Sequence, residues 1–178
     1  MLTTPEVQSP QRSWAARIAA GAALTLLALA LAQPGKAHAS TTCAWAGTPL
    51  APAGWFTLDP GVTMTPSAGP LRFVAWGDLS GSDPRCQGQM KFIGQVDAGA
   101  TCALLSFEGD VKGLPGVARF WGKGSLLVPS LLYDKDGNLV GLENANIMTQ
   151  HNQSLTTSCA EPGGFTGPAD FSSTVVLF

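Results

Sequence analysis

Short apolar or alternating segments, separated by glycine and proline turns, constrain the fold of this chain more than any other feature of its sequence. No apolar pattern with the 3.6-residue period of a helix persists, whereas residues 87–92 alternate so that Met90 and Phe92 share one face. Similar runs recur at fairly even spacing, which is typical of a sandwich or barrel. The pattern predicts an all-β fold, a single antiparallel β barrel or sandwich of about 8–10 strands.

Nine segments are expected to form strands, and a tenth is expected within residues 43–56. The nine are residues 61–65, 71–76, 86–95, 100–107, 118–122, 126–133, 138–148, 155–159 and 172–178. Turn chemistry predicts tight connections at residues 113–116 and 134–138. A free apolar tail would aggregate, so the last run is expected to pair with the first and close a barrel.

The first 39 residues have the pattern of a cleavable signal peptide. Two arginines precede an uncharged apolar run at residues 18–32, and a proline–glycine break leads to the small-x-small sequence Ala37-His38-Ala39. A membrane anchor would need about 20 apolar residues, and this run is shorter. Residues 1–39 are therefore predicted to be a signal peptide and residues 40–178 a secreted, extracellular β domain.

The charge of the domain that remains after cleavage limits its partners. Residues 40–178 contain seven basic and eleven acidic side chains, a net charge near −4. Nucleic acids and anionic membrane surfaces need a concentrated basic face, so neither is expected as a partner. The remaining partner classes are a small molecule, a glycan or an extracellular protein.

Four cysteines, Cys43, Cys86, Cys102 and Cys159, lie in the mature part of the chain. An even number in an exported protein favours two disulfides. Close C-x-x-C pairs and neighbouring histidines are missing, so no metal site is expected. A turn at residues 97–99 would place Cys102 opposite residues near 94 and away from Cys86. The pairing Cys43–Cys86 with Cys102–Cys159 is therefore preferred among the three possible connectivities.

Catalytic and cofactor motifs are not found in this sequence. The mature part has one histidine, His151, in a polar segment, and no G-x-S-x-G sequence. Asp134, Asp136 and Asn138 resemble the start of a calcium loop, but the glycine comes fourth and the spacing fits an ordinary hairpin better. No catalytic residue and no cofactor are predicted, and a non-enzyme is favoured. A carboxylate pair assembled only in space stays open.

The segment 142–147 contains the candidate binding residues. Asparagine is depleted in strands, yet Asn144 and Asn146 would share one face of a strand with Glu143 on the other. If the asparagine face lines a barrel near Trp121 or Arg119, the result is a polar pocket with an aromatic wall. Trp121, Glu143, Asn144 and Asn146 are therefore the predicted binding residues. The alternative is a solvated sheet face or a β-bulge.

The chain resembles a loose group of small secreted four-cysteine β proteins of actinobacteria, most of them uncharacterised. The resemblance is carried by Cys86-x-Gly88, by the segment leading into Ala100-Thr101-Cys102, by the turn at 113–116, and by Cys159 before a terminal strand. It implies a structural framework and transfers no functional residue. Secreted four-cysteine protease inhibitors have closer cysteine pairs and fit less well.

These features favour a non-catalytic binding or surface-interaction module. One alternative is a secreted enzyme with a carboxylate site assembled in space. The other is an inhibitor of an extracellular protease that inserts the exposed turn at residues 113–116.

Overall fold

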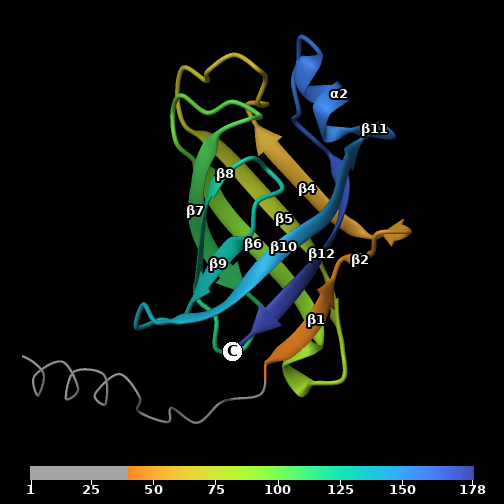
Figure 1. The fold of residues 1–178 in the computed structure, drawn as a ribbon, viewed down its shortest axis with the longest axis vertical. Helices are drawn as coiled ribbons and strands as arrows, with labels where there is room; N and C mark the ends of the chain where they lie inside the picture. The colour runs from red at the N-terminus through yellow and green to blue at the C-terminus, as the bar shows by residue number, and fades with distance from the viewer. Residues whose placement is uncertain (1–39) are drawn as a thin grey trace, which may run out of the picture. The chain divides into compact units, whose positions relative to one another are not determined.

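The computed structural model describes residues 40–178, so the predicted signal peptide lies outside the described residues. The strands are β1 (Thr41–Trp45), β2 (Gly47–Thr48), β3 (Ala51–Pro52), β4 (Gly54–Asp59), β5 (Leu71–Ser80), β6 (Gly88–Val96), β7 (Leu105–Lys112), β8 (Arg119–Gly124), β9 (Ser130–Tyr133), β10 (Leu139–Gln150), β11 (Gln153–Ser154) and β12 (Ala169–Leu177). A 3-10 helix, η1 (Pro84–Cys86), and an α-helix, α2 (Leu155–Ala160), complete the described elements (Figure 1).

The strands close into an eight-strand antiparallel barrel, which confirms the predicted fold class. Neighbours follow chain order from β4 to β10, and β12 then pairs with both β10 and β4. Strands β1 and β4 together occupy one barrel position, because β1 pairs with β12 up to Trp45↔Ser173 and β4 continues from Gly54↔Phe171. The small β2–β3 hairpin lies between them in the chain. The expected pairing of the last strand with the first is confirmed.

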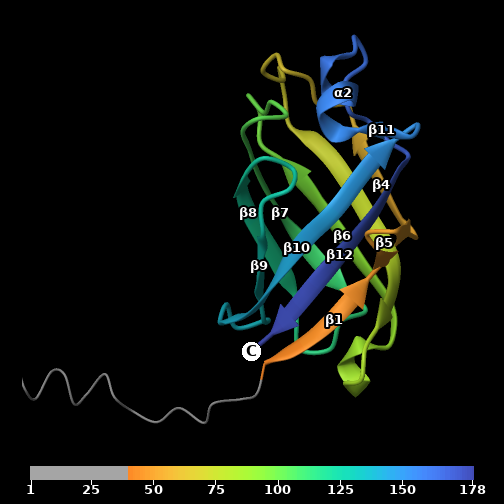
Figure 2. The same ribbon diagram turned by 45° about the vertical axis from the view of Figure 1, so that its right-hand side comes forward.

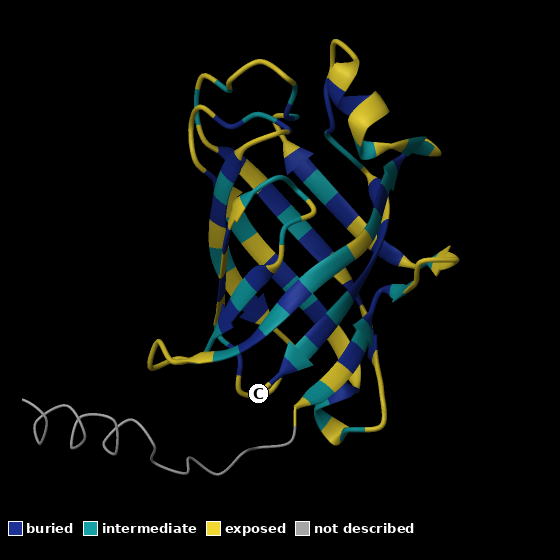
Figure 3. Cartoon of the chain, in the orientation of Figure 1, coloured by how far each residue is buried: buried dark blue, intermediate teal, exposed yellow. Residues whose placement is uncertain are grey.

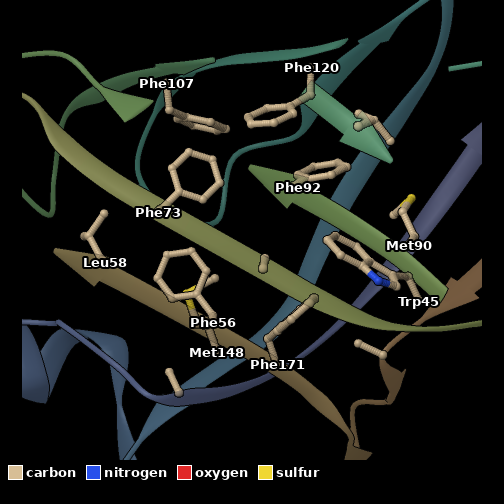
Figure 4. Close-up of a cluster of buried hydrophobic side chains, with 14 of the residues drawn as sticks. Trp45, Phe56, Leu58, Phe73, Met90, Phe92, Phe107, Phe120, Met148 and Phe171 are labelled. Atoms are coloured by element: carbon tan, nitrogen blue, oxygen red, sulfur yellow. The ribbon is translucent and has the colours of Figure 1, made fainter. Parts of the chain in front are cut away.

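Buried and exposed residues alternate along the strands, so one face of the sheet is packed in the interior and the other is open to solvent, as Figure 3 shows in the alternating blue and yellow bands. Aromatic rings from several strands fill the interior (Figure 4). Phe92 and Phe120 stack with centroids 4.3 Å apart, and Trp45 lies 4.8 Å from both Phe92 and Phe171. Edge and stacked contacts of this kind add to the stability supplied by burial alone.

Two glycines make room for this packing. Gly94 on β6 and Gly109 on β7 are paired and share the inward face. A Cβ at either position would lie 2.8 Å from Cζ of the Phe120 ring. The ring therefore occupies the space that two side chains would otherwise take, which accounts for glycine in the middle of both strands.

Both disulfides have the preferred pairing. Cys43–Cys86 joins β1 to η1, and Cys102–Cys159 joins the β6–β7 connection to α2. All four cysteines are buried.

Several predicted strands have different boundaries. Residues 155–159, expected to be a strand, form α2, because the Ser154 hydroxyl accepts a hydrogen bond from the Thr157 N–H and caps the helix. Residues 61–65, 100–104 and 126–129 are mainly loop. In the second of these loops, Thr101 bonds the Leu104 N–H, and a side chain that satisfies the local backbone competes with strand pairing.

Within residues 40–178, no helix has the length and apolar character needed to cross a membrane.

Candidate functional site

The most unusual group inside the barrel is the carboxyl group of Glu143. Glu143 lies on β10 with its side chain on the inward face, and only 6 % of the residue is exposed. A serine on each neighbouring strand contacts it. The Ser130 hydroxyl on β9 donates to Oε2 at 2.9 Å, and the Ser173 hydroxyl on β12 contacts Oε1. Two flanking strands thus hold the two oxygens of one acid.

Glu143 borders a cavity of about 50 Å³ in the barrel interior. Aromatic and aliphatic side chains make up nearly all of its remaining wall. The lining residues are Trp45, Phe56, Phe73, Ala75, Phe92, Val96, Phe107, Leu126, Ser130, Glu143, Ala145, Met148 and Phe171. Glu143 is the one ionisable side chain in this lining. An apolar space with a few convergent polar groups is the usual composition of a small-molecule site.

Burial determines the ionisation of this acid. Removal from water penalises the charged form, so the pKa of Glu143 is raised above its ordinary value. The hydrogen bonds from Ser173 and Ser130 act in the opposite direction, but they are the smaller effect. No lysine, arginine or histidine lines the cavity among the described residues. No cationic side chain of the described lining therefore offsets the cost of burying the charged form of Glu143.

The barrel wall is incomplete beside this acid. The β9–β10 ladder ends at the pair Ser130↔Glu143, while β10 continues to Gln150 and β8 continues to Gly124. The loop at residues 125–129 spans the space between β8 and the upper part of β10 (Figure 2). Leu126 of this loop lines the cavity. One side of the cavity is thus covered by a loop side chain instead of a hydrogen-bonded strand.

The structure separates the two asparagines from Glu143. Asn146 is the extra residue of a β-bulge, since β10 pairs Ala145 with Ser173 and then Ile147 with Ser172. Its side-chain amide donates to Thr174 Oγ1 at 3.1 Å on the exposed surface. Asn144 alternates with the inward-facing Glu143 and has its side chain on the outer face. The asparagine face therefore does not line the cavity, and the acid on the opposite face does.

Trp121 also lies outside the barrel. It is on the outer face of β8 and is 38 % exposed. It lines an external groove of about 300 Å³ together with Arg119, Glu108 and Tyr133. The expected neighbourhood of Trp121 and Arg119 is present, but on the opposite side of the wall from Glu143.

Ser130 and Ser173 were not among the predicted site residues. Their role depends on strand register, which places Ser130 opposite Glu143 and Ser173 opposite Ala145, the next inward-facing residue of β10. The available signal was a serine on the apolar face of the last strand, Ala169–Leu177, where Ser173 shares the inward face with Phe171 and Val175. Serine is uncommon at fully buried positions unless it is hydrogen-bonded.

Other candidate groups form no site. His151 is exposed in the β10–β11 turn with φ +52°. Asp134 accepts hydrogen bonds from the backbone N–H groups of Asp136 and Asn138 and from the Asn138 side chain. These bonds lower the pKa of Asp134 and stabilise the β9–β10 hairpin. No cluster of three or more potential metal ligands was found in the described part of the chain.

Comparisons of this chain with protein-family models, curated proteins and solved structures found no match.

Proposed function

We propose that the chain is a secreted, non-catalytic β barrel that binds a small, mainly apolar molecule in the cavity beside Glu143. The observation that carries this proposal is the buried acid itself. Burying a carboxyl group without a cationic partner in an aromatic interior costs stability even where two serines bond it, and an apolar residue would pack the same position at lower cost. A binding role accounts for keeping such a group.

The size of the cavity indicates how a ligand enters. A cavity of about 50 Å³ holds a few water molecules, whereas a cavity of about 150 Å³ accommodates a benzene ring. A ring-sized ligand therefore needs an additional volume next to Glu143. This volume becomes available when the Leu126 side chain moves away from the cavity. Leu126 is able to move because its loop lies outside the strand ladders. Movement of loop 125–129 opens the cavity while the barrel stays closed elsewhere.

The location of the protein is part of the proposal. The pattern of residues 1–39 predicts export, and two disulfides are compatible with an oxidising compartment. A ligand would then be taken up outside the cell.

The alternative functions have less support. An enzyme with two cooperating carboxylates needs a second acid in the site, and none lines the cavity among the described residues. A protease inhibitor would use the exposed turn at 113–116, but Leu114 in this turn is buried and anchors it to the barrel. No contact specifically favours either function. Hydrolysis that disappears in His151→Ala would contradict the non-catalytic proposal.

Native mass spectrometry of the secreted protein tests the proposal. The denatured, unreduced mass should correspond to residues 40–178 less four hydrogens for two disulfides. The native sample should carry additional mass that denaturation removes. Ala145→Leu, which fills the cavity, should lose this mass, whereas Asn144→Leu places the same side chain on the outer face and should retain it. A bare native protein, or equal retention by both variants, contradicts an interior binding site.

A further inference from the structure

Ser173 determines where the hydrogen atoms of the site lie. Its hydroxyl group has one hydrogen, yet it contacts two oxygens, Oε1 of Glu143 and the backbone carbonyl of Asn144, the latter at 2.9 Å. A backbone carbonyl can only accept a hydrogen bond. If Ser173 donates to Asn144, the hydrogen in the other contact has to come from Glu143.

A neutral Glu143 satisfies every contact of this group. Its proton lies on Oε1 and is donated to the Ser173 oxygen, while Ser173 donates to the Asn144 carbonyl. Oε2 is then the carbonyl oxygen of the acid and accepts from Ser130 at 2.9 Å. An ionised Glu143 would leave two oxygens facing each other with no hydrogen between them, either at Glu143 or at Asn144. The count of hydrogens thus favours the neutral acid on geometric grounds, in the same direction as its burial.

This arrangement leaves the cavity with acceptors and no free donor on its polar side. The Glu143 proton is used by Ser173, and the Ser130 hydrogen is used by Oε2. Oε2 and the Ser130 oxygen each keep unused acceptor capacity. The indole N–H of Trp45, which also lines the cavity, is occupied because it donates to the Gly77 carbonyl at 3.1 Å.

We propose that the cavity selects an apolar ligand that carries a hydrogen-bond donor, a hydroxyl or amine group, and that it rejects carboxylates and carbonyl compounds without a donor. This inference rests on the proposed interior binding function. A donor group can bond Oε2 or Ser130 without disturbing the existing hydrogen bonds. A carboxylate or ketone would place an acceptor against acceptors, and a buried polar group without a partner costs affinity. No described cation in the lining is available to neutralise an anionic ligand.

A series of ligands with one carbon skeleton tests the selection. Benzyl alcohol, benzylamine, benzaldehyde and benzoate are titrated calorimetrically into the mature, disulfide-bonded protein at pH 7. We expect the alcohol or the amine to bind at least 10-fold more tightly than benzaldehyde, and benzoate to show no measurable binding. Repeating the titrations in buffers of different ionisation enthalpy separates the two donors. Benzylamine is cationic at pH 7 and releases a proton when it binds as the neutral amine beside neutral Glu143, whereas the alcohol releases none.

Infrared spectroscopy tests the hydrogen arrangement directly. At pH 7, the wild-type protein should show the carbonyl stretch of one neutral carboxylic acid. Glu143→Gln should lose this band, and Glu108→Gln, which removes an exposed acid from the outer face, should keep it. Absence of the band in the wild type, or tighter binding of benzaldehyde or benzoate than of the donors, overturns the inference alone. Failure of all four ligands to bind overturns the proposed interior site as well.

Discussion

Ser130 and Glu143 are the last pair at which β9 and β10 face each other, and the hydrogen bond between their side chains holds the wall together where the backbone ladder stops. This one hydrogen bond therefore links β9 to β10 in the barrel wall and also fixes the two polar side chains that line the cavity. Removing it should affect stability and the site together.

Ser130→Ala tests this double role. The variant leaves Oε2 of Glu143 without its protein partner, so we expect a loss of about 1–3 kcal/mol in the free energy of unfolding. Ser172→Ala is the matched control, because the Ser172 hydroxyl is equally buried but has no hydrogen-bond partner. Denaturant titration with intact disulfides measures both. Equal effects of the two substitutions would show that the Ser130 bond contributes nothing specific.

The two leucines of the 125–129 loop should differ in their effect on ligand entry. Leu126 is partly buried against the core and lines the cavity, whereas Leu127 is 41 % exposed. Leu126→Ala enlarges the cavity and should accelerate benzyl alcohol binding several-fold, at a cost of about 1–2 kcal/mol in stability. Leu127→Ala should change neither quantity. Stopped-flow fluorescence and denaturant titration are the measurements, and identical association rates in both variants would exclude loop 125–129 as the entrance.

The stability of the protein should fall as Glu143 ionises. Because burial raises the pKa of Glu143 in the folded protein, the folded state binds this proton more tightly than the unfolded chain does. The contribution of Glu143 is complete below its unfolded pKa, near 4.5, and is lost as the pH rises toward the folded pKa. Glu143→Gln should lack this decline.

Unfolding free energies measured from pH 4 upward, wild type against Glu143→Gln, isolate this effect. Contributions from other acids cancel in the difference. One of them is Asp83, whose pKa is held low by its hydrogen bonds with Arg85. A constant difference between the two proteins across the pH range would contradict a raised Glu143 pKa.

Gln150 should stabilise one end of the barrel. Its side-chain oxygen accepts hydrogen bonds from the Thr166 and Gly167 N–H groups at 2.6 Å, and its amide donates to the Gly164 carbonyl at 3.3 Å. Gln150→Ala removes all three bonds from a buried position, and we expect a loss of about 2–4 kcal/mol. Hydrogen exchange at Thr166 and Gly167 should accelerate in the alanine variant, and unchanged protection there would contradict the assignment.

Removal of either disulfide should destabilise the barrel without changing its topology. The bridges close loops of 43 and 57 residues, for which the chain-entropy relation gives about 4 kcal/mol each. Paired serine substitutions, Cys43→Ser with Cys86→Ser and Cys102→Ser with Cys159→Ser, should lower the unfolding free energy by comparable amounts. Circular dichroism should retain the β signal in both. Loss of that signal in either variant would show that the bridge is required for the fold itself.

The sequence by itself determined the features that depend on local chemistry. Alternation of side chains, turn residues at 113–116 and 134–138, and four cysteines in a chain with a predicted signal peptide led to an antiparallel β fold with the observed disulfide pairing. The helix at Leu155–Ala160 was missed, because a six-residue segment has too little periodicity and its formation depends on the Ser154 cap. The neighbourhood of Arg119 and Trp121 was expected from the sequence, and the structure places it on the outer face of β8, on the other side of the wall from Glu143.

Only the tertiary structure determined which side chains of segment 142–147 face the barrel interior. Segment 142–147 was selected for its asparagines, but the strand has two faces, and the choice of which one enters the barrel depends on pairing with β9 and β12. That pairing turned Glu143 inward and brought Ser130 and Ser173 to it from 13 and 30 residues away in the chain. The bulge at Asn146 then kept Met148 and Gln150 on the inner face. A one-residue change of register exchanges the faces of a strand, and register is a property of the closed sheet that no single segment contains.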